Sequence, residues 1–179
     1  YPTDSYSELV REVCSLAFYN RDFLLFFRGQ DRDYLNKAGS STYYPTIYRK
    51  DLLTAQEAHS RFDTLESAEV KLADILIAEG LEGRQDVERR SNIARSVLQH
   101  YGVCDTPLLD FTRSLRAAAS FAQRNNQEER GVVAVFGLPY PTNRVTYNSE
   151  HDLVIVNLLA TCPPLAQRPH FQEGWLAGT

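Results

Sequence analysis

The sequence predicts an α+β fold, and two observations lead to this class. Apolar runs typical of buried strands occur at residues 23–28, 132–136 and 153–159. Helical periodicity fills other segments, but the predicted helices and strands do not alternate regularly along the chain. A doubly wound parallel sheet requires that alternation, so we expect an α+β arrangement instead.

Four segments show the apolar spacing of amphipathic helices. The predicted helices cover residues 5–20, 63–79, 86–101 and 115–124. Ser5 and Glu8 have capping-box spacing at the start of the first, while Gly80 and Gly102 follow the second and third as helix stops. The fourth is rich in alanine, which lets a helix pack closely against a sheet. A turn is expected at residues 125–130.

Composition and charge exclude several classes of protein. The chain has 179 residues, enough for one domain, and its net charge of −4 gives no basic footprint for nucleic acid. The three cysteines, Cys14, Cys104 and Cys162, are far apart and support neither a disulfide framework nor a zinc site. The histidines also lack metal-ligand spacing, so we expect no metal.

Location and completeness follow from the same composition. No stretch approaches the roughly 18 apolar residues of a membrane span, and there is no signal peptide. Together with the cysteine pattern, this predicts a cytoplasmic protein with no membrane association. The chain contains no methionine, even at position 1, so we expect it to be a trimmed part of a longer chain. The pattern does not indicate an oligomeric state.

Arg28 ends the first apolar run and is followed by Gly29 and Gln30. A guanidinium fork matches the geometry of carboxylate and phosphate groups, and a glycine lets a backbone approach closely. Two interpretations fit equally well: a structural ion pair, or a clamp for an anionic ligand. An aromatic loop at residues 43–48, with Tyr44 and Tyr48, could form the wall of a pocket for a flat ligand or simply pack on the core.

Two further polar blocks lie beside apolar segments, at residues 99–112 and 168–175. His100 falls in the last turn of its helix, where capping a carbonyl is the simpler interpretation. Asp110 and Thr112 precede the alanine-rich helix, so they are candidate N-caps or ligand-facing groups. Gln172 and Glu173 belong to no periodic segment, and a glutamate of that kind usually faces solvent.

Taken together, the blocks resemble the FRG domain family, whose name is spelled here by Phe27-Arg28-Gly29. The likeness covers most of the chain and implies a single FRG-type domain at residues 1–179. Its segments are Phe26–Gln30, Pro45–Arg49, Glu69, Gln99–Gly102, Thr106, Leu108–Thr112, Ala118–Ala122, Arg168–Gln172 and Gly174. One departure is Pro107, where the family commonly has arginine, so we expect a basic contact to be missing.

The resemblance further implies a layout similar to that of ADP-ribosyltransferases, with a split mixed or antiparallel sheet flanked by helices. It implies an NAD-consuming transferase or NAD glycohydrolase, of the kind found in toxin and defence proteins. NAD would be the substrate, a nucleotide-type small molecule, and the macromolecular acceptor is not indicated. The implied NAD-binding residues are Arg28, Gly29, Gln30, Tyr44, Tyr48 and Thr112.

The implied catalytic group is Glu173, Gln172 or Asp110. Breaking the glycosidic bond of NAD develops an oxocarbenium-like cation, which a nearby carboxylate stabilises. Glu173 is the only carboxylate of the last block, whereas Gln172 fits the family pattern better, and Asp110 is the alternative charge. A non-catalytic nucleotide-binding module or a protein-interaction module remains the alternative function.

Overall fold

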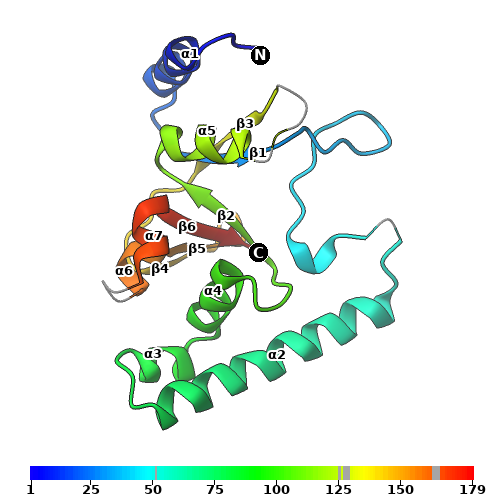
Figure 1. Ribbon diagram of the computed structural model, residues 1–179, viewed down its shortest axis with the longest axis vertical. Coiled ribbons are helices and arrows are strands. Elements are labelled where there is room, and N and C mark those ends of the chain that lie inside the picture. The colour runs from blue at the N-terminus through cyan, green and yellow to red at the C-terminus, as the bar shows by residue number, and fades with distance from the viewer. Residues whose placement is uncertain (51, 125, 127–129, 163–165) are drawn as a thin grey trace. The chain divides into compact units, whose positions relative to one another are not determined.

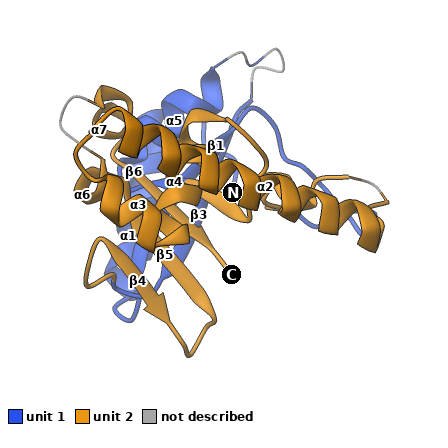
Figure 2. Cartoon of the chain, turned by 90° about the horizontal axis from the view of Figure 1, so that it is seen from below, with its two compact units in different colours: residues 1–42, 111–140 blue, residues 43–110, 141–179 orange. Residues whose placement is uncertain are grey.

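The computed structural model describes residues 1–50, 52–124, 126, 130–162 and 166–179. The chain divides into two compact units, which Figure 2 distinguishes by colour. Unit 1 contains residues 1–42 and 111–140, and unit 2 contains residues 43–110 and 141–179. Among the described helices, none combines the length and the apolar character that crossing a membrane requires.

Unit 1 is built on antiparallel strand pairs, with strand order β3-β1-β2. Its elements are α1 (Tyr6–Tyr19), β1 (Leu24–Gln30), α5 (Leu115–Gln123) and β3 (Val132–Leu138), all labelled in Figure 1. Strand β2 spans Leu108–Thr112, and its last two residues belong to unit 1. Strand β1 pairs with β3 along its whole length, and Phe27 of β1 is opposite Thr112 of β2. Every pairing found here is antiparallel, which agrees with the predicted α+β class.

Helix α5 packs very closely on β1, as its alanine content predicts. A Cβ atom on Gly29 would lie 1.9 Å from the carbonyl oxygen of Ala118, so only glycine fits at this position. The other face of β1 carries an aromatic cluster, because side chains alternate along a strand. The Phe111 ring lies edge-on to both Phe26 and Phe136, with centroid distances of 6.5 Å and 5.0 Å.

Unit 2 combines a group of helices with a second antiparallel set of strands, of order β6-β5-β4. Its elements are η1 (Thr46–Tyr48), α2 (Ala55–Ala78), α3 (Arg84–Arg89), α4 (Ser91–Tyr101), the start of β2, β4 (Val145–Asn148), β5 (Leu153–Asn157), α6 (Leu158–Thr161), α7 (Gln167–Gln172) and β6 (Gly174–Gly178). Separate apolar clusters hold the strands and the helices. They are Leu108, Val154, Val156, Leu158 and Leu176; Ile47, Leu65 and Leu98; and Val87, Ile93 and Ala94.

Two predicted helices have different bounds in the structure. The helix expected at residues 63–79 begins at Ala55, because Thr54 and Glu57 form a complete capping box there. The helix expected at residues 86–101 is two helices, since Arg90 adopts an extended backbone conformation between α3 and α4. The first predicted helix is confirmed as α1, with the Ser5 hydroxyl accepting a hydrogen bond from the Glu8 amide.

Strand ends also differ from the prediction. Strand β1 continues two residues past Arg28, so this arginine lies inside the strand rather than at its end. The apolar run at residues 153–159 is a strand only as far as Asn157. The Asn157 side chain then accepts a hydrogen bond from the Leu159 amide at 3.1 Å and caps α6. Of the turn predicted at residues 125–130, residues 125 and 127–129 lie outside the described part of the chain.

Candidate functional site

The first polar block lies in unit 1, on β1. Arg28 and Gln30 are partly buried and share the face of Phe26, because they alternate with Phe27 and Gly29. Gly29 is turned the other way, toward α5, so the close backbone approach expected there is made by a helix. The Oε1 atom of Gln30 is buried, and no described residue forms a hydrogen bond with it.

Thr112 lies on the opposite face from Arg28. It is the partner of Phe27 in the β1–β2 pairing, and partners in an antiparallel pair project to the same side. Its hydroxyl accepts a hydrogen bond from the Ser114 amide at 3.0 Å. The residue as a whole is buried, with 4% of its surface exposed. Ser114 is the N-cap of α5, so the N-cap interpretation of Asp110 and Thr112 is wrong.

The second polar block forms a connected cluster in unit 2. The side-chain amide of Gln99 donates a hydrogen bond to Oδ2 of Asp110 at 2.7 Å. The Thr106 hydroxyl donates to the Gln99 carbonyl and accepts from the Leu108 amide at 3.2 Å. Gln99 therefore links α4 to the start of β2, and it orients the Asp110 carboxylate. Gln99 and Thr106 belong to the motif segments of the sequence, but the sequence pattern alone does not indicate that they link α4 to β2.

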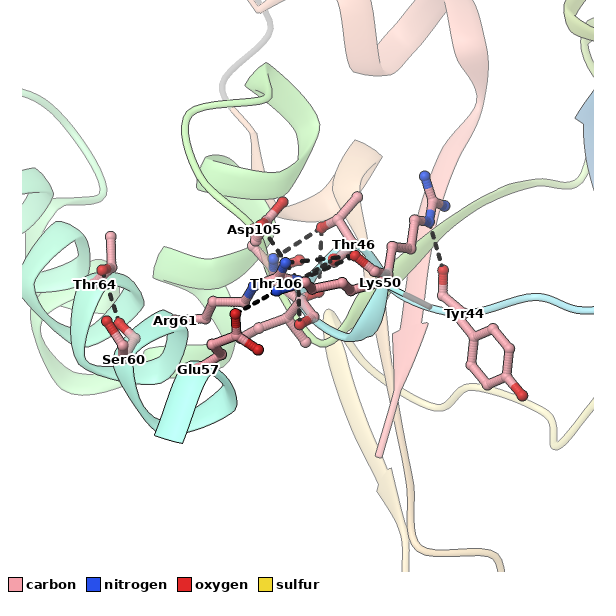
Figure 3. Close-up of polar contacts among 11 residues, drawn as sticks. Tyr44, Thr46, Lys50, Glu57, Ser60, Arg61, Thr64, Asp105 and Thr106 are labelled. Carbon is pink, nitrogen blue, oxygen red and sulfur yellow. Dashed lines mark hydrogen bonds and ion pairs between the residues drawn. The ribbon is translucent and has the colours of Figure 1, made fainter. Parts of the chain in front are cut away.

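The cluster extends to η1, as Figure 3 shows. The Thr106 amide donates to the Thr46 hydroxyl at 3.1 Å. From α2, the guanidinium of Arg61 donates to the Ile47 carbonyl at 2.7 Å and lies 3.9 Å from the Asp105 carboxylate. Arg61 was not singled out in the sequence, because the helix that carries it was predicted to begin two residues later. The structure thus joins the segments at residues 45–49 and 99–112 within one unit.

His100 is a buried polar side chain beside this cluster. Its residue is 2% exposed, and its Nε2 atom has no hydrogen-bond partner among the described residues. Burial, reinforced by the Arg168 charge, lowers the pKa of His100 below its ordinary value, while Asp110 opposes that shift. His100, Asp110 and Arg168 therefore interact electrostatically within unit 2. The helix end itself is closed by Gly102, whose amide donates to the carbonyls of residues 98 and 99.

The two predicted ring-binding tyrosines belong to the segment before α2. Tyr44 is 57% exposed, and its ring points away from the polar cluster in Figure 3, while its carbonyl accepts from Nε of Arg49 at 2.8 Å. The Tyr48 ring lies against Phe62 with a centroid distance of 6.1 Å and is tilted by 56°. Tyr48 therefore packs on α2, whereas Tyr44 is turned to solvent.

Gln172 and Glu173 mark the end of α7, a helix that the sequence analysis did not predict. Gln172 is its last residue and is partly buried. Glu173 is the C-cap, with a left-handed backbone (φ 46°) and an exposed side chain. The left-handed region is uncommon for a residue other than glycine, and here it closes a helix. Among the described residues, no group of His, Cys, Asp and Glu is arranged to hold a metal ion.

The predicted site residues are thus divided between the two units. Unit 1 holds Arg28, Gly29, Gln30 and Thr112, and unit 2 holds Tyr44, Tyr48, Asp110, Gln172 and Glu173. Comparison with curated proteins and with solved structures gives no significant match. The model of the FRG domain family matches residues 24–131, which is more than half of the chain and includes its first two polar blocks. The chain therefore belongs to the FRG domain family.

Proposed function

We propose that this chain binds a nucleotide-type ligand, NAD in particular, and breaks its nicotinamide glycosidic bond as an ADP-ribosyltransferase or NAD glycohydrolase. The observation that carries the proposal is the buried Nε2 atom of His100. Buried polar atoms in folded proteins almost always have a hydrogen-bond partner, so an atom without one among the described residues is a candidate contact for a group supplied from outside the chain, such as water, an ion or a ligand. A bound ligand is such a group.

Charge supports a ligand with both polar and ionic parts. Asp110 and Arg168 both act electrostatically on His100, so a carboxylate and a cation accompany the buried imidazole. A neutral imidazole offers one donor and one acceptor nitrogen, which suits a carboxamide or a ribose hydroxyl. Arg28 of unit 1 is proposed separately as a phosphate contact, on the family resemblance, because a guanidinium matches phosphate oxygens in a bidentate way.

The proposed reaction breaks the bond between the ribose C1′ atom and the nicotinamide nitrogen. The bonding electron pair leaves with nicotinamide, and the ribose becomes an oxocarbenium-like cation. Asp110, held by Gln99 at 2.7 Å, is the carboxylate proposed to stabilise that cation. Water or an acceptor nucleophile then bonds to C1′ and loses its proton. Glu173 and Gln172 remain the alternative groups for this step.

A second candidate is binding without turnover, and the engagement of the proposed chemical groups favours it. Asp110 already accepts from Gln99, the Thr112 hydroxyl accepts from Ser114, and Glu173 is an exposed helix cap. Because these side chains already hold the fold together, they are less available for a chemical step, which favours a module that binds a ligand without converting it. Under this candidate NAD stabilises the protein, but nicotinamide is not released.

Nicotinamide release from NAD, followed by chromatography, separates the two candidates. Turnover predicts release by the native chain and a fall of about 100-fold or more in Asp110→Asn, which keeps an oxygen for Gln99 while losing the charge. Arg28→Lys keeps the positive charge but loses the bidentate fork, so we expect weaker apparent NAD binding. Arg116→Lys is the matched control, because Arg116 is exposed on α5.

Three outcomes divide the possibilities. Release that Asp110→Asn abolishes supports the transferase or glycohydrolase function. A rise in melting temperature with NAD or ADP-ribose, without release, supports the binding module instead. Neither release nor a thermal shift with either compound contradicts both candidates.

A further inference from the structure

A pocket of about 580 Å³ lies among helices α2, α3 and α4 of unit 2. It contains none of the residues of the candidate site described above. Arg95 of α4 and Glu69 of α2 lie in its lining and form an ion pair at 2.6 Å, with side chains only 24% and 14% exposed. This largely buried ion pair joins α4 to α2 within the lining of the pocket.

The wall of the pocket is an apolar stripe on α2. Val70 and Ile77 are seven residues apart and therefore lie on the same face of the helix, with Ala73 between them. Val70 is 61% exposed and Ile77 is 45% exposed, whereas Leu65 of the same helix is fully buried in a core cluster. Val70 and Ile77 are thus apolar side chains of α2 left largely uncovered, whereas Ala73 between them is partly buried against the cluster of Val87, Ile93 and Ala94.

Negative charge surrounds this stripe. Glu66 and Asp74 of α2 and Glu88 of α3 line the pocket, and no described residue forms an ion pair with any of them. Glu69 is neutralised by Arg95, and Arg89 is the only other cation among the described lining residues. Excess carboxylates around exposed apolar side chains favour a partner that carries both positive charge and apolar surface.

We propose that this pocket docks a basic, amphipathic helical segment of a partner protein. The spacing on α2 specifies the pattern. Glu66 and Asp74 are eight residues apart, a rise of about 12 Å, and the apolar Val70 lies between them. A partner helix alongside α2 matches this arrangement with two basic residues seven positions apart, a rise of about 10.5 Å, and apolar residues between them on the same face.

A labelled peptide tests this docking directly. The probe is a 16-residue helix of alanine and glutamine that carries Lys-x-x-Leu-Leu-x-x-Lys, titrated with the whole 179-residue chain and followed by fluorescence anisotropy. The control peptide has both lysines moved two positions along, which turns them to the opposite face of the helix. We expect saturable binding of the first peptide, at least about tenfold weaker binding of the second, and weaker binding at high salt.

Variants of the pocket provide the second arm. Glu66→Gln combined with Asp74→Asn removes the two exposed ion pairs proposed between these carboxylates and the lysines of the peptide, and should weaken peptide binding about fivefold. Ile77→Ser should weaken it by loss of apolar contact. Glu82→Gln is the matched control, since Glu82 is exposed and does not line the pocket, and it should leave binding unchanged. All four positions are exposed, so the melting temperature should change little.

Several results would overturn the proposal. Equal affinity for the two peptides would show that the lysine pattern is irrelevant. An equal loss of peptide affinity in Glu82→Gln and in the double variant would show that only the net charge of the chain matters, not the carboxylates of the pocket. Spermidine that binds as tightly as the peptide and displaces it would assign the pocket to small polycations. Absence of binding at millimolar peptide concentration would contradict the proposal that the pocket docks a helix.

Discussion

His100 combines deep burial with a pKa below its ordinary value, and this makes stability depend on pH. Below the ordinary histidine pKa of about 6.5, the unfolded chain takes up a proton that the folded chain resists. The free energy of unfolding should therefore be fully present above pH 6.5 and fall as the pH drops below it. Urea unfolding between pH 8 and pH 5 measures this dependence.

Two histidine variants isolate the source of that pH dependence. His100→Gln replaces the buried imidazole with a side chain that does not titrate in this range, so the free energy of unfolding of this variant should decrease less over the same interval. His59→Gln should keep the native dependence, because the His59 side chain is 82% exposed on α2. If His100→Gln and the native chain lose stability in parallel, His100 is not the residue responsible.

Several site residues were predictable from the sequence, but their environments were not. The sequence marked His100 and Asp110, yet it favoured a capping role for both. The C-cap is Gly102, as its position after the helix predicted, and the N-cap is Ser114. Local spacing allows several residues near a helix end to cap it, and the choice depends on backbone angles that spacing does not contain. Burial of His100 depends on contacts from distant segments, which a single sequence does not reveal.

At the scale of elements, the contact between β1 and α5 depends on Gly29. Adding a methyl group at this position places a Cβ atom 1.9 Å from the Ala118 carbonyl oxygen, so backbone must move. We expect Gly29→Ala to lower the free energy of unfolding by about 3 kcal/mol, at the upper end of overpacking costs. Gly137→Ala on β3 is the control, since the nearest atom to an added Cβ is Cβ of Phe23 at 3.1 Å, a tight contact rather than an overlap. Chemical denaturation with similar losses for both variants would contradict the close packing.

The start of α2 depends on the capping box of Thr54 and Glu57. The Glu57 carboxylate accepts from Lys50 and from the backbone and hydroxyl of Thr54, which together lower its pKa to about 2. Thr54→Ala should lower the free energy of unfolding by about 1 kcal/mol, as N-cap replacements do. Thr64→Ala, at an exposed position inside α2, should change it by less than about 0.5 kcal/mol. Equal effects in denaturant titrations would mean that the cap contributes nothing.

The long elements followed from periodicity, and the short ones did not. Helices α1 and α5 were predicted close to their observed bounds, because apolar spacing extends over most of their length, whereas β1 and β3 each continue two residues beyond the predicted end. Helix α7 has six residues and β6 has five, which is too short for a period to be recognised. The break at Arg90 was also missed, since neither glycine nor proline marks it.

At the scale of the whole molecule, the motif blocks of the FRG domain family are distributed over two compact units. The sequence identified these blocks, and the family match over residues 24–131 confirms the membership. Within unit 2, the segments at residues 45–49 and 99–112 are joined by Thr46, Thr106 and Gln99. The opposite orientation of Arg28 and Thr112 could not be predicted, because it depends on the register of β1 against β2.

The claim that His100 faces a ligand is tested most directly by calorimetric titration of NAD and of ADP-ribose onto the 179-residue chain. We predict saturable binding of at least one of them to the native chain and to His59→Gln. Binding to His100→Gln should be about tenfold weaker, the loss of one buried hydrogen bond to the ligand. Equal affinities for the native chain and His100→Gln, or no binding heat from either compound, would contradict the account.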